Sequence, residues 1–102
     1  MTTEFLDRKN EANRLVSEDR VKKYLINGII ERWVVVGNKR NYLVMSNPFW
    51  CRCYDFQNEV LNDRIAKCKH TLAVLIAQRE NKYDIFEVNK EEYDFIREEL
   101  IL

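Results

Sequence analysis

All three cysteines and the single histidine of this 102-residue chain fall into two tight pairs. Cys51 and Cys53 are separated by one residue, fourteen residues follow, and Cys68 and His70 are again separated by one residue. Residues two apart on a strand point to the same face, so the first pair can direct both sulfurs at one point. Three thiolates and one imidazole form a closed tetrahedral set suited to structural zinc. We call Cys51, Cys53, Cys68 and His70 the ligand cluster, and predict that it binds one structural Zn²⁺.

The spacing of the second pair constrains the local structure around it. Two positions apart on a regular helix amount to about 200° of rotation, so Cys68 and His70 cannot converge if both are helical. We therefore expect Cys68 in a loop and His70 in the first turn of the following helix. The positive end of that helix would favour the nearby thiolates.

Three other interpretations compete with zinc. The cysteines could be small buried apolar residues, which is the usual role of a cysteine outside such a pattern. A disulfide between Cys51 and Cys53 would be strained by its short ring. An iron–sulfur cluster can also use three cysteines and a histidine, but the small proteins that do so have a longer spacer before the histidine and a Cys-Asp-Gly run. Only Lys69 separates Cys68 from His70, so zinc is favoured.

The helices and strands predicted around the ligand cluster indicate an α+β fold. We expect a single domain over 1–102. Segments rich in β-branched and aromatic residues predict a three-stranded antiparallel meander at 29–36, 41–46 and 49–54. Residues 37–40 are a plausible hairpin connection, Asn47-Pro48 marks the next turn, and 83–88 is a short extended stretch. Helices are expected at 3–14, 17–27, 70–79 and from about residue 90. The fold is thus a β-β-β-α core, stapled by zinc, between an N-terminal and a C-terminal helix.

Capping patterns support two of these helices. Ser17-Glu18-Asp19 is typical of a helix start, and Asn27-Gly28 is typical of a helix end. Asn89 followed three residues later by Glu92 resembles a capping box.

With these elements in place, the chain resembles the SWIM-type zinc finger family. That family has a C-x-C pair after strands and a C-x-H pair before a helix. The stretch from Cys51 to Phe56 is similar to its frequent C-x-C-P-D-F run, with Tyr54 in place of the proline, and 68–74 is similar to its C-K-H-x-L-A-V run. The resemblance covers about 20–79, while 1–16 and 80–102 lie outside it.

This resemblance implies a non-catalytic module that binds DNA or proteins. SWIM fingers occur in chromatin-remodelling ATPases, transposases and ubiquitin ligases. They also occur as small proteins that pair with RecA-family recombinase paralogues in homologous recombination. We therefore expect an adaptor in DNA transactions that contacts a partner protein, with direct, sequence-nonspecific DNA binding as the alternative.

The charge distribution bears on both alternatives. Residues 31–79 hold eight Lys/Arg against four Asp/Glu, whereas 80–102 hold three against eight. The basic residues of this middle segment could contact phosphates, and its aromatic residues could stack on bases. Scattered Lys and Arg residues are, however, more often simply solvent-exposed, and aromatic residues on strands more often belong to the core. The candidate nucleic-acid residues are Arg32, Lys39, Arg40, Arg52, Lys67 and Lys69, and the aromatic ones are Trp33, Tyr42, Trp50 and Tyr54.

The acidic C-terminal segment offers a protein-binding surface instead. Tyr93, Ile96 and Leu100 recur at helical spacing and could lie in a partner's groove, or could pack on the chain's own sheet. Catalysis is not expected, because the single histidine is a metal ligand and the sequence has no Gly-rich phosphate loop. We expect no small-molecule substrate. No signal peptide or membrane span is visible, and an odd number of clustered cysteines fits an intracellular protein.

Overall fold

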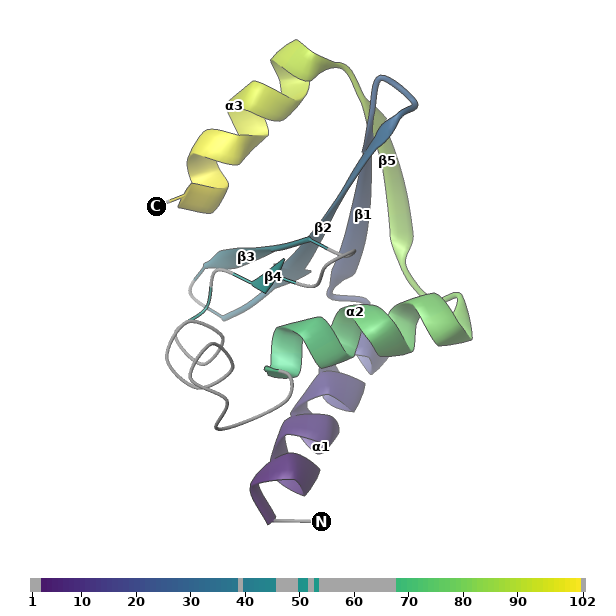
Figure 1. The fold of residues 1–102 in the computed structure, drawn as a ribbon, viewed down its shortest axis with the longest axis vertical. Helices are drawn as coiled ribbons and strands as arrows, with labels where there is room; N and C mark the ends of the chain where they lie inside the picture. The colour runs from purple at the N-terminus through teal and green to yellow at the C-terminus, as the bar shows by residue number, and fades with distance from the viewer. Residues whose placement is uncertain (1–2, 39, 46–49, 52, 54–67, 102) are drawn as a thin grey trace.

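The computed structural model describes residues 3–38, 40–45, 50–51, 53 and 68–101, which form a small α+β fold (Figure 1). This fold class is the predicted one. The elements in chain order are α1 (Thr3–Ser17), β1 (Val21–Ile26), β2 (Ile30–Val36), β3 (Asn41–Met45), β4 (Trp50–Cys51), α2 (Lys69–Glu80), β5 (Asp84–Val88) and α3 (Lys90–Ile101).

The strands form one mixed sheet in the order β4-β3-β2-β1-β5. The neighbouring pairs β1–β2, β2–β3 and β3–β4 are antiparallel, whereas β5 runs parallel to β1. The predicted meander is therefore present as β2, β3 and β4, extended by two strands on its β2 side. The sequence predicts the third strand over 49–54, but β4 ends at Cys51, and Cys53 lies in a bend beyond it. Residues 49, 52 and 54 lie outside the described residues.

The prediction of a helix over 17–27 is wrong. The segment from Val21 to Ile26 is β1, hydrogen-bonded to β2 on one side and β5 on the other. The polar residues before it end α1 instead of starting a new helix, because Asp19 adopts a left-handed conformation (φ 57°). Asn27 and Gly28 (φ 53° and 71°) have the paired positive φ of a type I′ turn, and they connect β1 to β2 as a hairpin.

The core lies between one face of the sheet and the helix pair α1 and α2, which pack together (Figure 1). Register alignment places Val21 opposite Val35, and Trp33 opposite Val44. These four side chains share one face because side chains alternate along a strand. They are buried against α1 and α2, whose buried residues include Ala12, Leu15, Val16, Ala73, Val74 and Ala77.

Helix α3 lies apart from α1 and α2, toward the opposite end of the sheet (Figure 1). Its predicted capping box is present: the Asn89 N–H donates to Glu92 Oε1 (3.1 Å), and the Glu92 N–H donates to Asn89 Oδ1 (2.8 Å). None of the described helices is long and apolar enough to cross a membrane.

Candidate metal centre

The ligand cluster comes together at one point between β4 and α2. Its four ligand atoms lie within 4.8 Å of one another, and all four residues are buried. Cys51 Sγ lies 3.7 Å from His70 Nδ1. Around a tetrahedral zinc with Zn–S of about 2.3 Å and Zn–N of about 2.0 Å, a sulfur and a nitrogen are about 3.5 Å apart. The four residues are thus close enough to hold one metal ion, and their arrangement is consistent with zinc.

The sheet positions the first pair of ligands. Cys51 ends β4 and pairs with Val44, so it shares the face that packs on α1 and α2. Cys53 follows two residues later and is also buried. Both ligand atoms lie within 4.8 Å of those of Cys68 and His70 on α2, although Cys53 lies in a bend beyond the end of β4.

Helix α2 positions the second pair. Cys68 is its N-cap, with an extended backbone (φ −78°, ψ 168°), and His70 lies in the first turn. The Thr71 N–H donates to Cys68 Sγ (3.5 Å), and Thr71 Oγ1 donates to the Cys68 carbonyl oxygen (3.0 Å). The prediction of a loop cysteine and a first-turn histidine is confirmed. The N-terminal N–H groups of the helix stabilise negative charge on the Cys68 sulfur.

The electrostatics of the three thiols call for a cation. Hydrogen bonds from Cys51 and Cys53 lower the pKa of Cys68. Hydrogen bonds with Cys53, the larger effect, and with Cys68 raise the pKa of Cys51. Three buried thiolates cannot coexist at these distances without a compensating charge. A divalent ion bound here would supply that charge and take the place of the thiol protons.

Tyr42 on β3 supports the histidine. Its ring stacks on the His70 ring with a centroid distance of 4.1 Å and an interplanar angle of 25°. This contact fixes the imidazole plane while Nδ1 faces the sulfurs. The sequence marked Tyr42 only as an aromatic residue able to stack on bases, because strand register could not be assigned without the structure. Trp33, another of those aromatic residues, is buried in the core against Tyr83.

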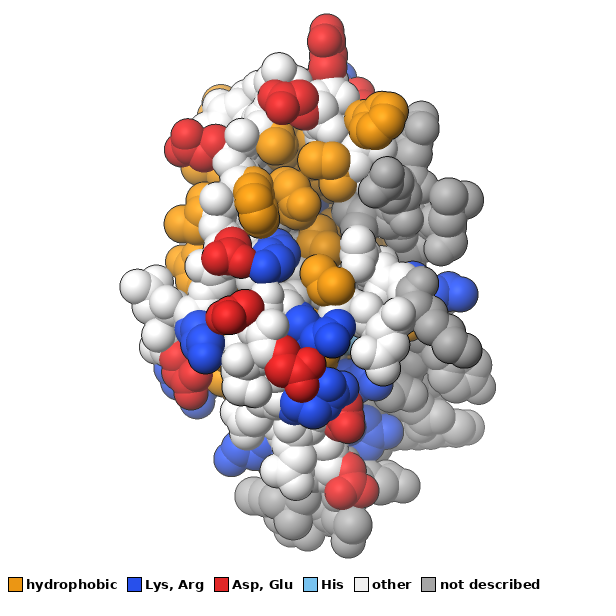
Figure 2. Space-filling view, turned by 180° about the vertical axis from the view of Figure 1, so that it is seen from behind, with side chains coloured by type: hydrophobic (Ala, Val, Ile, Leu, Met, Phe, Trp, Pro, Cys, Tyr) orange, Lys and Arg blue, Asp and Glu red, His pale blue; other side chains and the backbone are white. Residues whose placement is uncertain are grey.

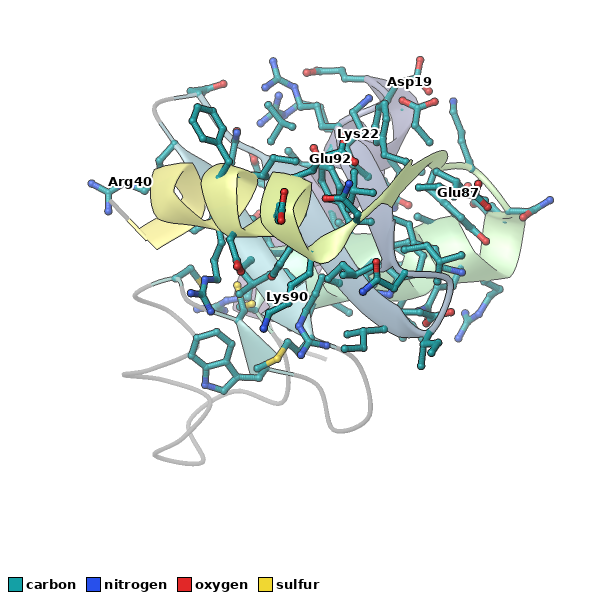
Figure 3. All side chains as sticks on the ribbon, turned by 90° about the horizontal axis from the view of Figure 1, so that it is seen from above. Asp19, Lys22, Arg40, Glu87, Lys90 and Glu92 are labelled. Carbon is teal, nitrogen blue, oxygen red and sulfur yellow. The ribbon has the colours of Figure 1, made fainter. Side chains whose placement is uncertain are left out.

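The structure divides the candidate nucleic-acid residues between separate surfaces. Lys69 is in the first turn of α2, whereas Arg32 on β2 points to the opposite face of the sheet from the core residue Trp33. Arg40 is exposed, and it lies on the opposite side of the molecule from Glu87 in the view of Figure 3. Lys39, Arg52, Lys67 and the aromatic Tyr54 lie outside the described residues. Among the described residues, Arg32 thus lies on the opposite face of the sheet from the side that packs on the helix of Lys69.

The candidate partner-binding residues on α3 are only partly accessible. Tyr93 is 6% exposed and Ile96 is partly buried, whereas Phe95 is 72% exposed. The side chain of Leu100 lies outside the described residues. The burial of Tyr93 favours packing on the chain's own sheet for this residue. Binding of a partner to α3 remains a prediction.

Comparison with protein-family models, with curated proteins and with solved structures found no match to this chain. The resemblance to SWIM-type fingers therefore rests on the spacing and flanking residues of the motif alone.

Proposed function

We propose that the chain is a non-catalytic zinc-binding module of the SWIM type, acting as an adaptor in DNA transactions by contacting a partner protein. The observation that carries the proposal is the buried ligand cluster, which joins a strand to a helix. Four protein ligands leave no open position for a reactive water, so the metal would have a structural role. A module of this kind acts through its surfaces.

The surface that supports protein binding is the free edge of the sheet together with the β1–β2 hairpin. Among the described strands, β5 pairs only with β1, so its outer backbone groups can accept a further strand. Ile85 and Phe86 on this strand are exposed, as are Ile29 and Ile30 at the hairpin. Figure 2 shows hydrophobic side chains gathered over the upper half of one face, above a charged lower half.

The charge of this edge indicates what kind of partner segment would bind it. Asp84 and Glu87 flank the exposed apolar pair on β5, and Glu91 and Glu92 follow at the start of α3. Asp84 is paired with Lys22, whereas no ion pair joins Glu87 to another described residue. A complementary partner is an extended segment of another protein that combines apolar and basic side chains. The acidic edge would repel DNA, so the partner would be the DNA-acting member of the pair.

The test is co-expression with the RecA-family ATPases of the source organism, followed by size-exclusion chromatography of the zinc-loaded chain. We expect one stable complex, which the double variant Ile85→Lys/Phe86→Lys abolishes. Glu80→Lys, an exposed change on α2, adds positive charge outside this edge and should leave the complex intact. If both variants retain the complex, the proposed edge is wrong; if no RecA-family protein binds, the proposed partner class is wrong.

Direct, sequence-nonspecific DNA binding is the alternative function. It is favoured by exposed Arg40 on the loop between β2 and β3 and by Lys69 on α2. Phosphate contacts release counterions, so DNA affinity must fall steeply with salt. A titration with single- and double-stranded DNA at several salt concentrations tests this function, and absence of binding at low salt would exclude it.

A further inference from the structure

The outer edge of β5 has a definite hydrogen-bonding pattern. The Asn27 N–H donates to the Val88 carbonyl oxygen (2.9 Å), so the backbone groups of Val88 point toward β1. Because the backbone groups of successive residues point to opposite sides of a strand, those of Phe86 also point toward β1, whereas those of Ile85 and Glu87 point away from it. Among the strands that the structure describes, none lies on that outer side. The edge therefore offers the N–H and C=O groups of Ile85 and Glu87 to a further strand.

Both faces of β5 are open as well. Phe86 lies beside Tyr24, and their rings stack with a centroid distance of 5.4 Å and an interplanar angle of 27°. Ile85 points to the other face of the sheet, because side chains alternate along a strand. Phe86 is 43% exposed and Ile85 is 55% exposed, so the described helices cover neither side chain. Native sheets usually protect such an edge with lysine, proline or a bulge, whereas Asp84–Val88 contains neither lysine nor proline.

Glu87 gives this edge its charge. Its side chain is exposed and forms no ion pair with another described residue, whereas Asp84 is paired with Lys22. Residues 84–92 hold four carboxylates and one lysine. A strand that pairs with β5 places one residue directly opposite Glu87, and opposite charges attract across such a pair while like charges repel. The residue opposite Glu87 should therefore be lysine or arginine.

The direction of the added strand follows from the free backbone groups. In an antiparallel pair, residues that exchange two hydrogen bonds alternate with residues whose side chains lie closer together, and the pairing is slightly more stable per residue than a parallel one. Ile85 and Glu87 would each exchange two hydrogen bonds with the residue opposite. Phe86 would lie between them, at a position of close side-chain approach, where an aromatic residue would extend the stack that begins at Tyr24.

We infer that β5 binds an antiparallel peptide strand with a defined order of residues. From its N-terminal side, the peptide carries lysine or arginine, then an aromatic residue, then a β-branched apolar residue, opposite Glu87, Phe86 and Ile85 respectively. The inference rests on the proposed adaptor function for the choice of this edge, and it adds the direction and the residue pattern of the bound segment. A segment this short can be tested as a peptide.

The experiment is amide hydrogen exchange, followed by NMR on the ¹⁵N-labelled, zinc-loaded chain, alone and with a short peptide that carries Lys-Phe-Val between threonines. In the free chain, the N–H groups of Ile85 and Glu87 should exchange faster than that of Phe86. The peptide should slow the exchange of these two groups. The reversed peptide, with Val-Phe-Lys, should bind more weakly, because its lysine would lie opposite Ile85.

Charge reversal tests the register of the bound peptide. Glu87→Lys should weaken binding of the lysine peptide about fivefold, which corresponds to the loss of an exposed ion pair, and should make a Glu-Phe-Val peptide the better ligand. Glu80→Lys, an exposed change on α2, should keep the original preference. Phe86→Ala should weaken binding about tenfold because it removes the aromatic pair, whereas Phe95→Ala, at an exposed position on α3, should have little effect.

The inference is overturned if the lysine peptide at millimolar concentration changes the exchange of neither Ile85 nor Glu87. It is also overturned if the reversed peptide binds more tightly, or if Glu87→Lys leaves the preference between peptides unchanged. A chain that binds the lysine peptide but no RecA-family ATPase refutes the proposed partner class alone. A chain that binds such an ATPase but not the peptide refutes this inference alone.

Discussion

Replacing Cys68 by serine separates its two structural roles. Cys68 caps α2 through its sulfur, which accepts the Thr71 N–H, and it belongs to the ligand cluster. Serine is among the best N-cap residues but is a poor zinc ligand, so Cys68→Ser should keep the cap and lose the metal. Cys68→Ala loses both.

The expected magnitudes follow from the two roles of Cys68, as a zinc ligand and as an N-cap. A structural zinc contributes on the order of 10–16 kcal/mol in finger peptides, whereas a whole domain is stable by only about 5–15 kcal/mol. Loss of a ligand should therefore remove the cooperative unfolding transition or lower its midpoint by tens of degrees. Any difference between Cys68→Ser and Cys68→Ala should amount to only about 1 kcal/mol, the value of an N-cap. That difference corresponds to roughly 4–8 °C in Tm for a domain of this size.

The assay combines zinc content after dialysis against a chelator with thermal unfolding followed by circular dichroism. Val74→Ala is the matched control, because Val74 is fully buried on the same helix but is not a ligand. It should cost roughly 2 kcal/mol and still retain one zinc per chain. The reasoning is refuted if Cys68→Ser keeps a full equivalent of zinc and melts within a few degrees of the unmodified chain.

Three further predictions concern the surroundings of the centre and the last helix. Gly37→Ala should destabilise the chain by about 1–3 kcal/mol in urea unfolding, because the new Cβ would lie 2.7 Å from the Arg40 carbonyl oxygen and 3.0 Å from Tyr42. An unchanged midpoint would contradict this placement of the loop. Asn89→Ala should lower the free energy of unfolding by about 1 kcal/mol, because it removes one half of the capping box with Glu92. As a control, the same change at an exposed asparagine of α1 should lower it by less. Acidification should release zinc as protons displace it from the thiolates and the imidazole, which a zinc indicator would report; release that is independent of pH would argue against thiolate ligands.

The parts of the fold that follow local rules could be predicted from the sequence. The C-x-H spacing predicted the histidine in a first helical turn, because helix periodicity is fixed by the backbone. The C-x-C spacing predicted that the two sulfurs converge, although Cys53 lies beyond the end of β4. The same local logic predicted the hairpin between β2 and β3 and the capping box at Asn89. Long-range pairing could not be predicted in this way. The parallel contact of β5 with β1 joins segments about sixty residues apart and leaves no local signal.

The one wrong element shows how a local signal can serve two structures. Asn27-Gly28 fits both a helix end and a type I′ hairpin turn, since both require positive φ. The choice is made by tertiary pairing, because the apolar and aromatic residues of β1 are stabilised between two neighbouring strands. Tyr42 was missed as a support for His70 for the same reason, since the stacking depends on where β3 lies against α2.

The central claim is that one ion is bound by three sulfurs and one nitrogen of this chain. X-ray absorption at the zinc edge of the purified, reduced chain tests it most directly. The expected result is four-coordinate zinc with three sulfurs at about 2.3 Å and one nitrogen at about 2.0–2.1 Å. Coordination dominated by oxygen, fewer than three sulfur ligands, or no metal retained by the folded chain would contradict it.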